Sequence, residues 1–155
     1  RVLPIVGRDR YARGAGNMYI SAAGLYPVVD ACGPQIDQGS RLRFLGEIVW
    51  FPSAALSPRI RWTAIDDDSA RATLVDGDEP VSADFHFDAQ GRFVSLTAER
   101  AYSGDGTRQP WLVTASEWRP HDELEIPTAG EVLWRLPAGD FTYFRWEIDS
   151  LQLYP

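Results

Sequence analysis

The part of the chain from residue 59 onward is predicted to be a succession of strands with no helix between them, and this constrains the fold most. Residues 81–87 alternate apolar and polar side chains, which is the period of a half-buried strand. Polar clusters such as residues 66–69 supply the turns between successive strands. Because consecutive strands without crossover helices pair antiparallel, this part predicts an antiparallel meander.

One amphipathic helix is predicted before the meander. Asp37 is a good N-cap, and residues 38–50 follow it with apolar side chains every three or four positions until Pro52 stops the pattern. The apolar face of this helix is expected to contain Leu42, Phe44, Leu45, Ile48 and Val49. Residues 2–11 and 17–30 are predicted to form further strands.

A sheet of seven or more strands with a single helix must curl to bury its inner face. We therefore expect a mainly β (α+β) fold, a curled antiparallel sheet or half-barrel with the helix packed in its mouth. The length of 155 residues fits one domain spanning residues 1–155. The sequence opens inside an apparent strand without an initiator Met, so N-terminal strands are expected to be missing. An open sheet edge there would favour pairing into a homodimer.

Charge and composition exclude several classes of partner. The net charge of −7 argues against nucleic acid, which needs a basic surface. No run of about 18 apolar residues is present, so no transmembrane segment is expected. The single cysteine rules out an internal disulfide, is compatible with a reducing compartment, and favours a cytoplasmic location.

Motifs for metals and cofactors are lacking in the sequence. The two histidines, His86 and His121, are isolated from each other and lack a partner at metal-ligand spacing, so we expect no metal site. The sequence contains neither a Gly-x-Ser-x-Gly motif nor a glycine-rich loop that opens a helix. We therefore expect no α/β-hydrolase nucleophile and no cofactor.

Three residues of the predicted helix carry the most chemistry. Arg43, Glu47 and Trp50 are spaced by four and three residues and share one face. If this face looks into the curl, Glu47 beside Arg43 would bind a polar ligand head or move a proton, with Tyr143 or His86 as distant alternatives. A surface ion pair is the simpler interpretation of the same spacing.

Aromatic side chains form the second candidate set. Six Trp residues in this length are many, and each combines a large apolar area with one hydrogen-bond donor. Core packing is the default role, but a curled sheet lined by them would form an apolar pocket, and its rim would be within reach of Arg61, Arg100, Arg135 and Arg145. Together with Arg43 and Glu47, the predicted ligand-binding residues are Trp50, Trp62, Trp111, Trp134 and Tyr143.

Several segments resemble an uncharacterised bacterial domain family that is common in actinobacteria. They include Gly24–Asp30, Leu42–Ala54, Trp62–Leu74 and Gly130–Trp134, and the helix motif ending in Trp50-Phe51-Pro52 is the most specific. Members usually carry roughly one hundred further residues upstream. By shape the family is similar to the half-barrels of lipoprotein carriers that shield acyl chains, which is a likeness of fold alone.

Three functions are consistent with these features. The first is a binding module that holds an apolar or amphipathic small molecule in an aromatic-lined curled sheet. The second is a small enzyme in which Glu47 acts as acid or base on a hydrophobic substrate. The third is a structural or interaction domain with an exposed apolar patch.

Overall fold

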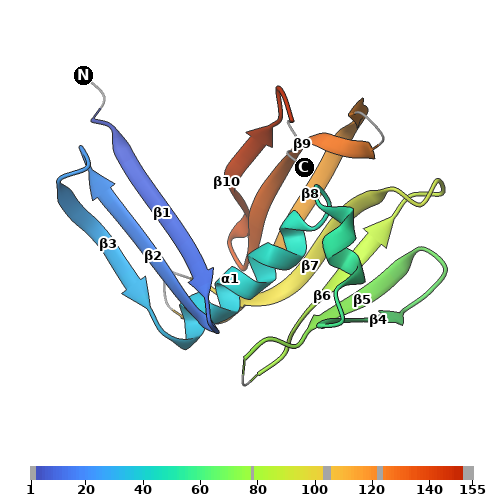
Figure 1. Ribbon diagram of the computed structural model, residues 1–155, viewed down its shortest axis with the longest axis horizontal. Helices are drawn as coiled ribbons and strands as arrows, with labels where there is room; N and C mark the ends of the chain where they lie inside the picture. Colours follow the sequence, from blue (N-terminus) through green and yellow to red (C-terminus); the bar gives the residue numbers. More distant parts are fainter. Residues whose placement is uncertain (1–2, 78, 103–105, 122–123, 152–155) are drawn as a thin grey trace.

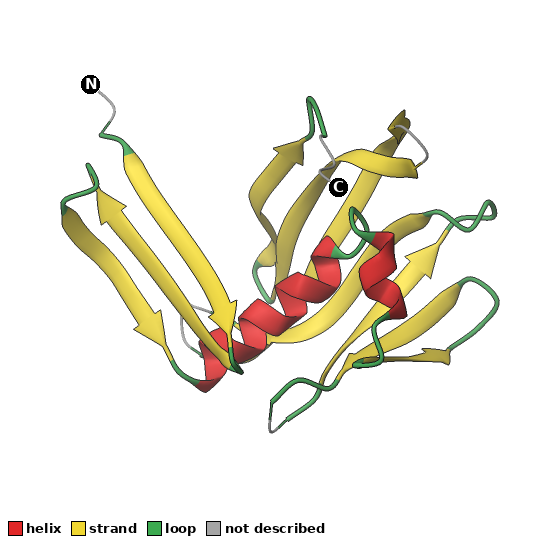
Figure 2. Ribbon diagram, viewed as in Figure 1, coloured by secondary structure: helices red, strands yellow, loops and turns green. Residues whose placement is uncertain are grey.

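The computed structural model describes residues 3–77, 79–102, 106–121 and 124–151. It consists of two antiparallel sheets joined by a single α-helix and a short 3-10 helix, as Figures 1 and 2 show. The three-stranded sheet is formed by β1 (Ile5–Ala12), β2 (Ala15–Ala22) and β3 (Tyr26–Cys32), in the order β1-β2-β3. It projects away from the rest of the molecule, and we refer to it as the wing (Figure 1).

The second sheet is a seven-stranded meander in which every strand pairs with its neighbour in sequence. Its order is β10-β9-β8-β7-β6-β5-β4, so β4 and β10 are its edges. The strands are β4 (Ile60–Ala64), β5 (Ser69–Leu74), β6 (Val81–Phe87), β7 (Phe93–Ala101), β8 (Arg108–His121), β9 (Leu124–Leu136) and β10 (Gly139–Glu147). The sheet curls around α1 (Pro34–Glu47), which confirms the predicted antiparallel meander with one helix in its concavity (Figure 1).

The helix begins one turn earlier than the sequence analysis predicted. Gly33 precedes it with φ of 108°, a conformation that glycine adopts readily, and Pro34 occupies the first turn. Asp37 lies inside the helix and is not its N-cap. Its carboxylate instead accepts a hydrogen bond of 2.5 Å from the backbone nitrogen of Gly16 in β2. The fixed φ of proline, which suits the first turn, explains the early start.

The predicted end at Trp50 was also wrong by one turn. The α-helix ends at Glu47, and residues 48–50 continue as hydrogen-bonded turns into η1 (Pro52–Leu56).

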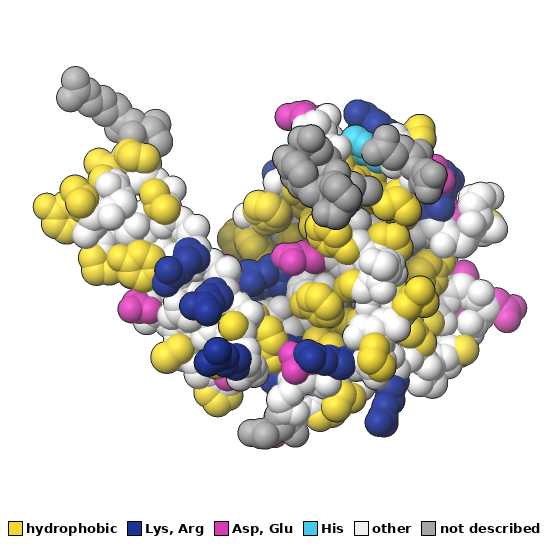
Figure 3. All heavy atoms as spheres, in the orientation of Figure 1, with side chains coloured by type: hydrophobic (Ala, Val, Ile, Leu, Met, Phe, Trp, Pro, Cys, Tyr) yellow, Lys and Arg dark blue, Asp and Glu magenta, His cyan; other side chains and the backbone are white. Residues whose placement is uncertain are grey.

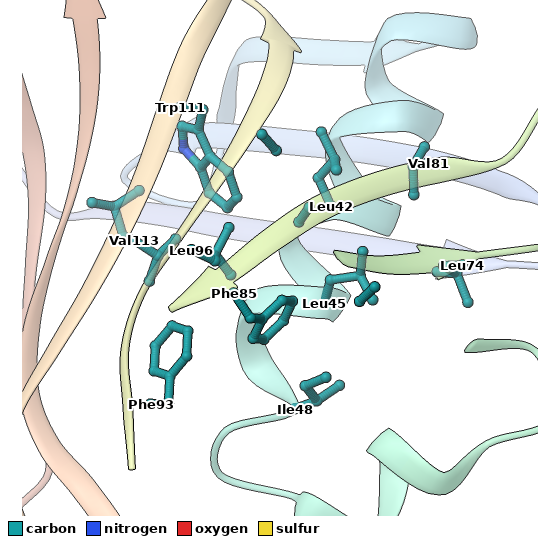
Figure 4. Packing of buried hydrophobic residues seen from close by; sticks show 14 of the residues in the cluster. Leu42, Leu45, Ile48, Leu74, Val81, Phe85, Phe93, Leu96, Trp111 and Val113 are labelled. Atoms are coloured by element: carbon teal, nitrogen blue, oxygen red, sulfur yellow. The ribbon is translucent and has the colours of Figure 1, made fainter. Parts of the chain in front are cut away.

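The helix packs on the concave face of the seven-stranded sheet. Leu42, Leu45 and Ile48 are 1%, 0% and 4% exposed and lie against side chains such as Phe85 and Leu96 (Figure 4). Phe44, predicted on the same face, is instead 40% exposed. The core therefore lies between α1 and the sheet.

The wing packs against a different side of the same helix. Gly16 in β2 makes the closest approach, because a methyl group there would lie 2.8 Å from Ser40 Oγ and 3.1 Å from the carbonyl oxygen of Ile36. Gly16 and Ser21 are the fully buried residues of the three strands, within the range that is described. The first predicted strand corresponds to β1, except that residue 2 lies outside the described residues. The separation of these strands into their own sheet was not predicted.

Candidate functional site

An open apolar cleft of about 240 Å³ lies where the C-terminal end of α1 meets the curled sheet, and we name it the mouth cleft. It is lined by Ile48, Val49, Pro52, Ala55, Trp62, Phe85, Phe87, Gly91, Phe93, Trp118 and Glu125. The lining comes from α1's C-cap and the turn after it, η1, and strands β4, β6, β7, β8 and β9. The mouth cleft is thus a part of the concave face of the curled sheet that α1 does not cover.

Aromatic rings form the floor of the mouth cleft. Phe85 is 2% exposed, and its ring centroid lies 5.1 Å from that of Trp62 and 5.4 Å from that of Phe93. Trp62 is 40% exposed, and its indole nitrogen donates a 3.0 Å hydrogen bond to the carbonyl oxygen of Ala55. The tryptophan therefore presents a fixed apolar ring at the opening of the cleft.

Charged groups lie at one side of this cleft. The carboxylate of Glu125 is 3.6 Å from a guanidinium nitrogen of Arg92, and Arg92 also pairs with Asp88 at 3.1 Å. Hydrogen bonds from Arg92 hold the pKa of Asp88 below its usual range. An apolar floor beside charged groups suits a molecule that has both an apolar and a polar end.

The predicted pair Arg43 and Glu47 lies elsewhere, on the side of α1 that faces the wing. Arg43 Nε is 3.4 Å from Glu47 Oε1, and Arg43 also pairs with Asp9 of β1. Burial raises the pKa of Glu47, and the charge of Arg43 opposes that rise. The Glu47 side chain is nonetheless 45% exposed, so the dry pocket that its acid–base role requires is not evident. That role stays a prediction.

A third charged side chain, Arg100 of β7, lies close to this pair. Its guanidinium carbon is 5.0 Å from the ring centre of Trp111 and 5.7 Å from that of Trp134. The indole nitrogen of Trp111 donates a 2.9 Å hydrogen bond to the hydroxyl oxygen of Tyr143 in β10. We name Asp9, Arg43, Glu47, Arg100 and Tyr143 the notch cluster, because they come from the wing, the helix and the large sheet, which border a notch (Figure 3).

Trp50 lies neither in the mouth cleft nor in the notch cluster. Its ring packs edge to face on Trp146 of β10, with the ring centroids 4.9 Å apart. Trp146 lies over Gly130, where any side chain would collide with it. The indole nitrogen of Trp50 is buried and has no hydrogen-bond partner among the described residues.

The structure thus divides the seven residues predicted as a ligand site. Trp62 lines the mouth cleft, whereas Arg43, Glu47 and Tyr143 lie in the notch cluster. Trp111 and Trp134 are 2% and 6% exposed and pack in the core next to that cluster.

Sequence reasoning did not identify Asp9, or Phe85 and Phe93 of the cleft floor. The alternating pattern of β6 and β7 marks the two phenylalanines as inward-facing, but any core residue gives the same signal.

In the parts of the chain that are described, no three His, Cys, Asp or Glu side chains converge to hold a metal ion. Neither helix there has the length and apolar character needed to cross a bilayer.

Comparison with known proteins gives one match. The model of a family described as "Family of unknown function (DUF6544)" matches residues 1–146. The chain belongs to this family. No curated protein and no solved structure matched it significantly. Membership in DUF6544 confirms the resemblance to an uncharacterised domain family and assigns no activity, so the functional argument depends on the site itself.

Proposed function

We propose that this DUF6544 domain is a binding module that holds the apolar part of a small amphipathic molecule in the mouth cleft. The observation that carries the proposal is the cleft itself, an opening floored by Phe85 and Phe93 with Trp62 at its edge. A larger hollow of about 870 Å³ lies near the N-terminal part of α1, but its lining is mostly polar and includes Gln38, Arg41 and Glu99, so it suits the apolar part of a ligand less well.

The size of the cleft limits the ligand. Drug-sized ligands occupy pockets of roughly 300–1,000 Å³, whereas a dry cavity of about 150 Å³ is enough for benzene. A cleft of about 240 Å³ suits one ring or a short alkyl chain. The pair of Arg92 and Glu125 would then lie near the polar end of the ligand.

The first test is native mass spectrometry of the protein as isolated, compared with its denatured mass. A mass that disappears on denaturation would identify the class of ligand. The second is a titration with 1-octanol, followed through the indole N–H resonances of Trp62 and Trp118. We expect saturable shifts in both, since both rings line the cleft.

A matched pair of variants separates the mouth cleft from other apolar surface. Ala55→Phe fills the cleft and should weaken octanol binding about tenfold or more, which corresponds to ~1.4 kcal/mol. Ala89→Phe adds the same side chain at an exposed turn outside the cleft and should leave binding unchanged. Equal binding by the two variants, or no saturable response in the unaltered protein, would contradict the proposal.

A second candidate, an interaction domain, is favoured by the wing. Large apolar side chains are exposed on it, among them Ile5 at 72%, Leu25 at 77% and Val28 at 65%. The wing has two edge strands, β1 and β3, that a second copy of the chain would extend. Sedimentation should then show self-association that Val28→Asp weakens and Val94→Asp on β7 does not. A monomer at every concentration would exclude this candidate.

A further inference from the structure

Arg100 of β7 is a half-buried cation that forms no ion pair with any carboxylate in the described parts of the chain. Among the described residues, no Asp or Glu oxygen lies within 4 Å of its guanidinium, although nine other ion pairs are present. Its neighbours are instead the rings of Trp111 and Trp134 and the backbone of Gly39. Burial lowers the pKa of Arg100, and the nearby Tyr143 hydroxyl and Asp9 carboxylate oppose that shift. Such a charge is costly unless something compensates it.

The guanidinium of Arg100 occupies the space beside Gly39 of α1. A methyl group at Gly39 would lie 2.8 Å from one terminal nitrogen of Arg100 and 3.0 Å from its Nε. Only the absence of a side chain at this point of α1 leaves room for the guanidinium between the helix and the two indole rings.

The hydroxyl of Tyr143 is a second hydrogen-bond donor close to the Arg100 guanidinium. The hydroxyl oxygen of Tyr143 already accepts the hydrogen bond from the indole nitrogen of Trp111, so its own proton is free for an acceptor. No described residue accepts that proton. Tyr143 also interacts with Arg100, and the charges of Arg43 and Asp9 are close enough to act on the Arg100 pKa. Arg100 and the Tyr143 hydroxyl thus lie close together in a cluster whose two carboxylates, Asp9 and Glu47, both pair with Arg43.

We propose that Arg100 and the Tyr143 hydroxyl, with Arg43 beside them, bind the carboxylate group of a small molecule that enters the notch between the wing and β10. A guanidinium and a carboxylate match in geometry and form two parallel hydrogen bonds. A carboxylate suits the charge balance better than phosphate does. Asp9 and Glu47 both pair with Arg43 and exceed its charge by one, so a doubly charged anion would meet stronger repulsion than a singly charged one.

This site is separate from the mouth cleft and does not depend on the function proposed for it. Gly39, which contacts Arg100, and Ile48, which lines the cleft, are nine residues apart on and beyond α1, roughly 13 Å along a helix. The alternative is that Arg100 only covers the two indole rings through cation–π contacts, which needs no ligand. Binding of a simple carboxylate distinguishes these roles.

The experiment is a titration of the protein with sodium acetate, with sodium chloride at matched ionic strength as reference. The indole N–H resonance of Trp111 is the reporter, because its acceptor is the Tyr143 hydroxyl. We expect a saturable shift with acetate, a weaker response to inorganic phosphate, and only a small linear drift with chloride. An acetate response that is as linear as that of chloride would overturn the proposal, and so would tighter binding of phosphate.

Variants then test the residues. Arg100→Gln should abolish the saturable response, whereas Tyr143→Phe keeps the ring and should weaken acetate binding roughly tenfold by removing one donor. Arg61→Gln, at an exposed position on β4, removes the same charge far from the notch and should bind acetate normally. If Arg100→Gln fails to fold, the acetate affinity of Tyr143→Phe tests the proposed site instead. Unchanged acetate affinity in Tyr143→Phe or in a folded Arg100→Gln would overturn the assignment.

Discussion

The wing and the seven-stranded sheet are built from the same element, the antiparallel hairpin, yet they bury very different amounts of apolar surface. The seven-stranded sheet contributes Phe85, Leu96 and Trp111 to the core, all 2% exposed or less. In the wing, by contrast, the fully buried positions are Gly16 and Ser21, and Ile5 is 72% exposed. Hairpin formation alone therefore does not stabilise a sheet in this protein. What differs is the side of α1 that each sheet covers, because Leu42 and Leu45 point into the large sheet whereas the wing meets the helix at Ser40.

This contrast leads us to expect two levels of stability. Elements that bury much apolar surface open only when the whole protein unfolds, whereas weakly packed elements open locally at lower free energy. The large sheet and α1 should form the first class, and the wing the second.

Removing a core ring should have the largest effect. Phe85→Ala should lower the free energy of unfolding by about 3–5 kcal/mol, because Phe85 is nearly inaccessible and contacts three other rings. Ile5→Ala on the wing should change it by about 0.5 kcal/mol or less. Urea denaturation measures both values. A loss of similar size at Ile5 would show that the wing belongs to the cooperative core.

The contact between wing and helix is tested at Gly16. Gly16→Ala places a methyl group 2.8 Å from Ser40 Oγ and close to the helix backbone, so we expect a cost of about 1–3 kcal/mol or a detached wing. Gly7→Ala on β1 is the matched control, since a methyl group there meets nothing within 4 Å. It should be neutral or slightly stabilising. Hydrogen exchange of β1–β3 would reveal detachment, and equal behaviour of the two variants would disprove the contact.

Within the large sheet, an ion pair joins β5 to β6 and predicts a dependence on pH. Two hydrogen bonds, of 2.6 and 2.8 Å, link Arg71 to Asp84, and these lower the pKa of Asp84. Because the carboxyl is more acidic in the folded than in the unfolded state, its stabilising effect is present above about pH 4 and is lost as the pH falls through the lowered pKa.

Asp84→Asn should therefore reduce stability by about 1 kcal/mol at neutral pH, since both side chains are partly exposed to solvent. The difference from the unaltered protein should vanish at about pH 2. Thermal unfolding at both pH values measures it. Asp140→Asn, in a more exposed pair with Arg135, should have a smaller effect at neutral pH. A difference that persists in acid would point to a cause other than the charge of Asp84.

The smallest effect is expected for the ion pair that ties the wing to the helix. Asp9→Asn removes one partner of Arg43, which keeps Glu47 as the other. Global stability should change by about 0.5 kcal/mol or less, while amide exchange in β1 should accelerate. Asp30→Asn, whose partner Asn17 lies within the wing, should leave exchange in β1 unchanged. A large global loss from Asp9→Asn would mean that the wing and the core unfold together.

Much of the fold followed from sequence pattern. The alternation in residues 81–87 predicted β6, and the absence of helical patterns after residue 59 predicted the antiparallel order of all seven strands. The apolar spacing of Leu42 and Leu45 placed them in the core. These predictions succeed because the apolar residues on a buried face recur with the period of their helix or strand. That period can be recognised from residues close together in the sequence.

The candidate sites were less accessible to such reasoning. Spacing along one helix predicted the pair of Arg43 and Glu47, and the 3.4 Å contact confirms it. It did not predict that Arg43 also pairs with Asp9, 34 residues earlier. Nor did the number of tryptophans indicate that Trp62 would line an open cleft while Trp111 would be buried.

The sequence by itself determined the element types, the antiparallel meander and the helix face that enters the core, because these depend on residues close together in the chain. Only the tertiary structure decided that β1–β3 form a separate wing, that the curl stays open at the mouth cleft, and that Arg100 and Tyr143 lie close together. Those features arise where distant segments approach one another. Local periodicity fixes which side of an element is buried, but not which partner covers it.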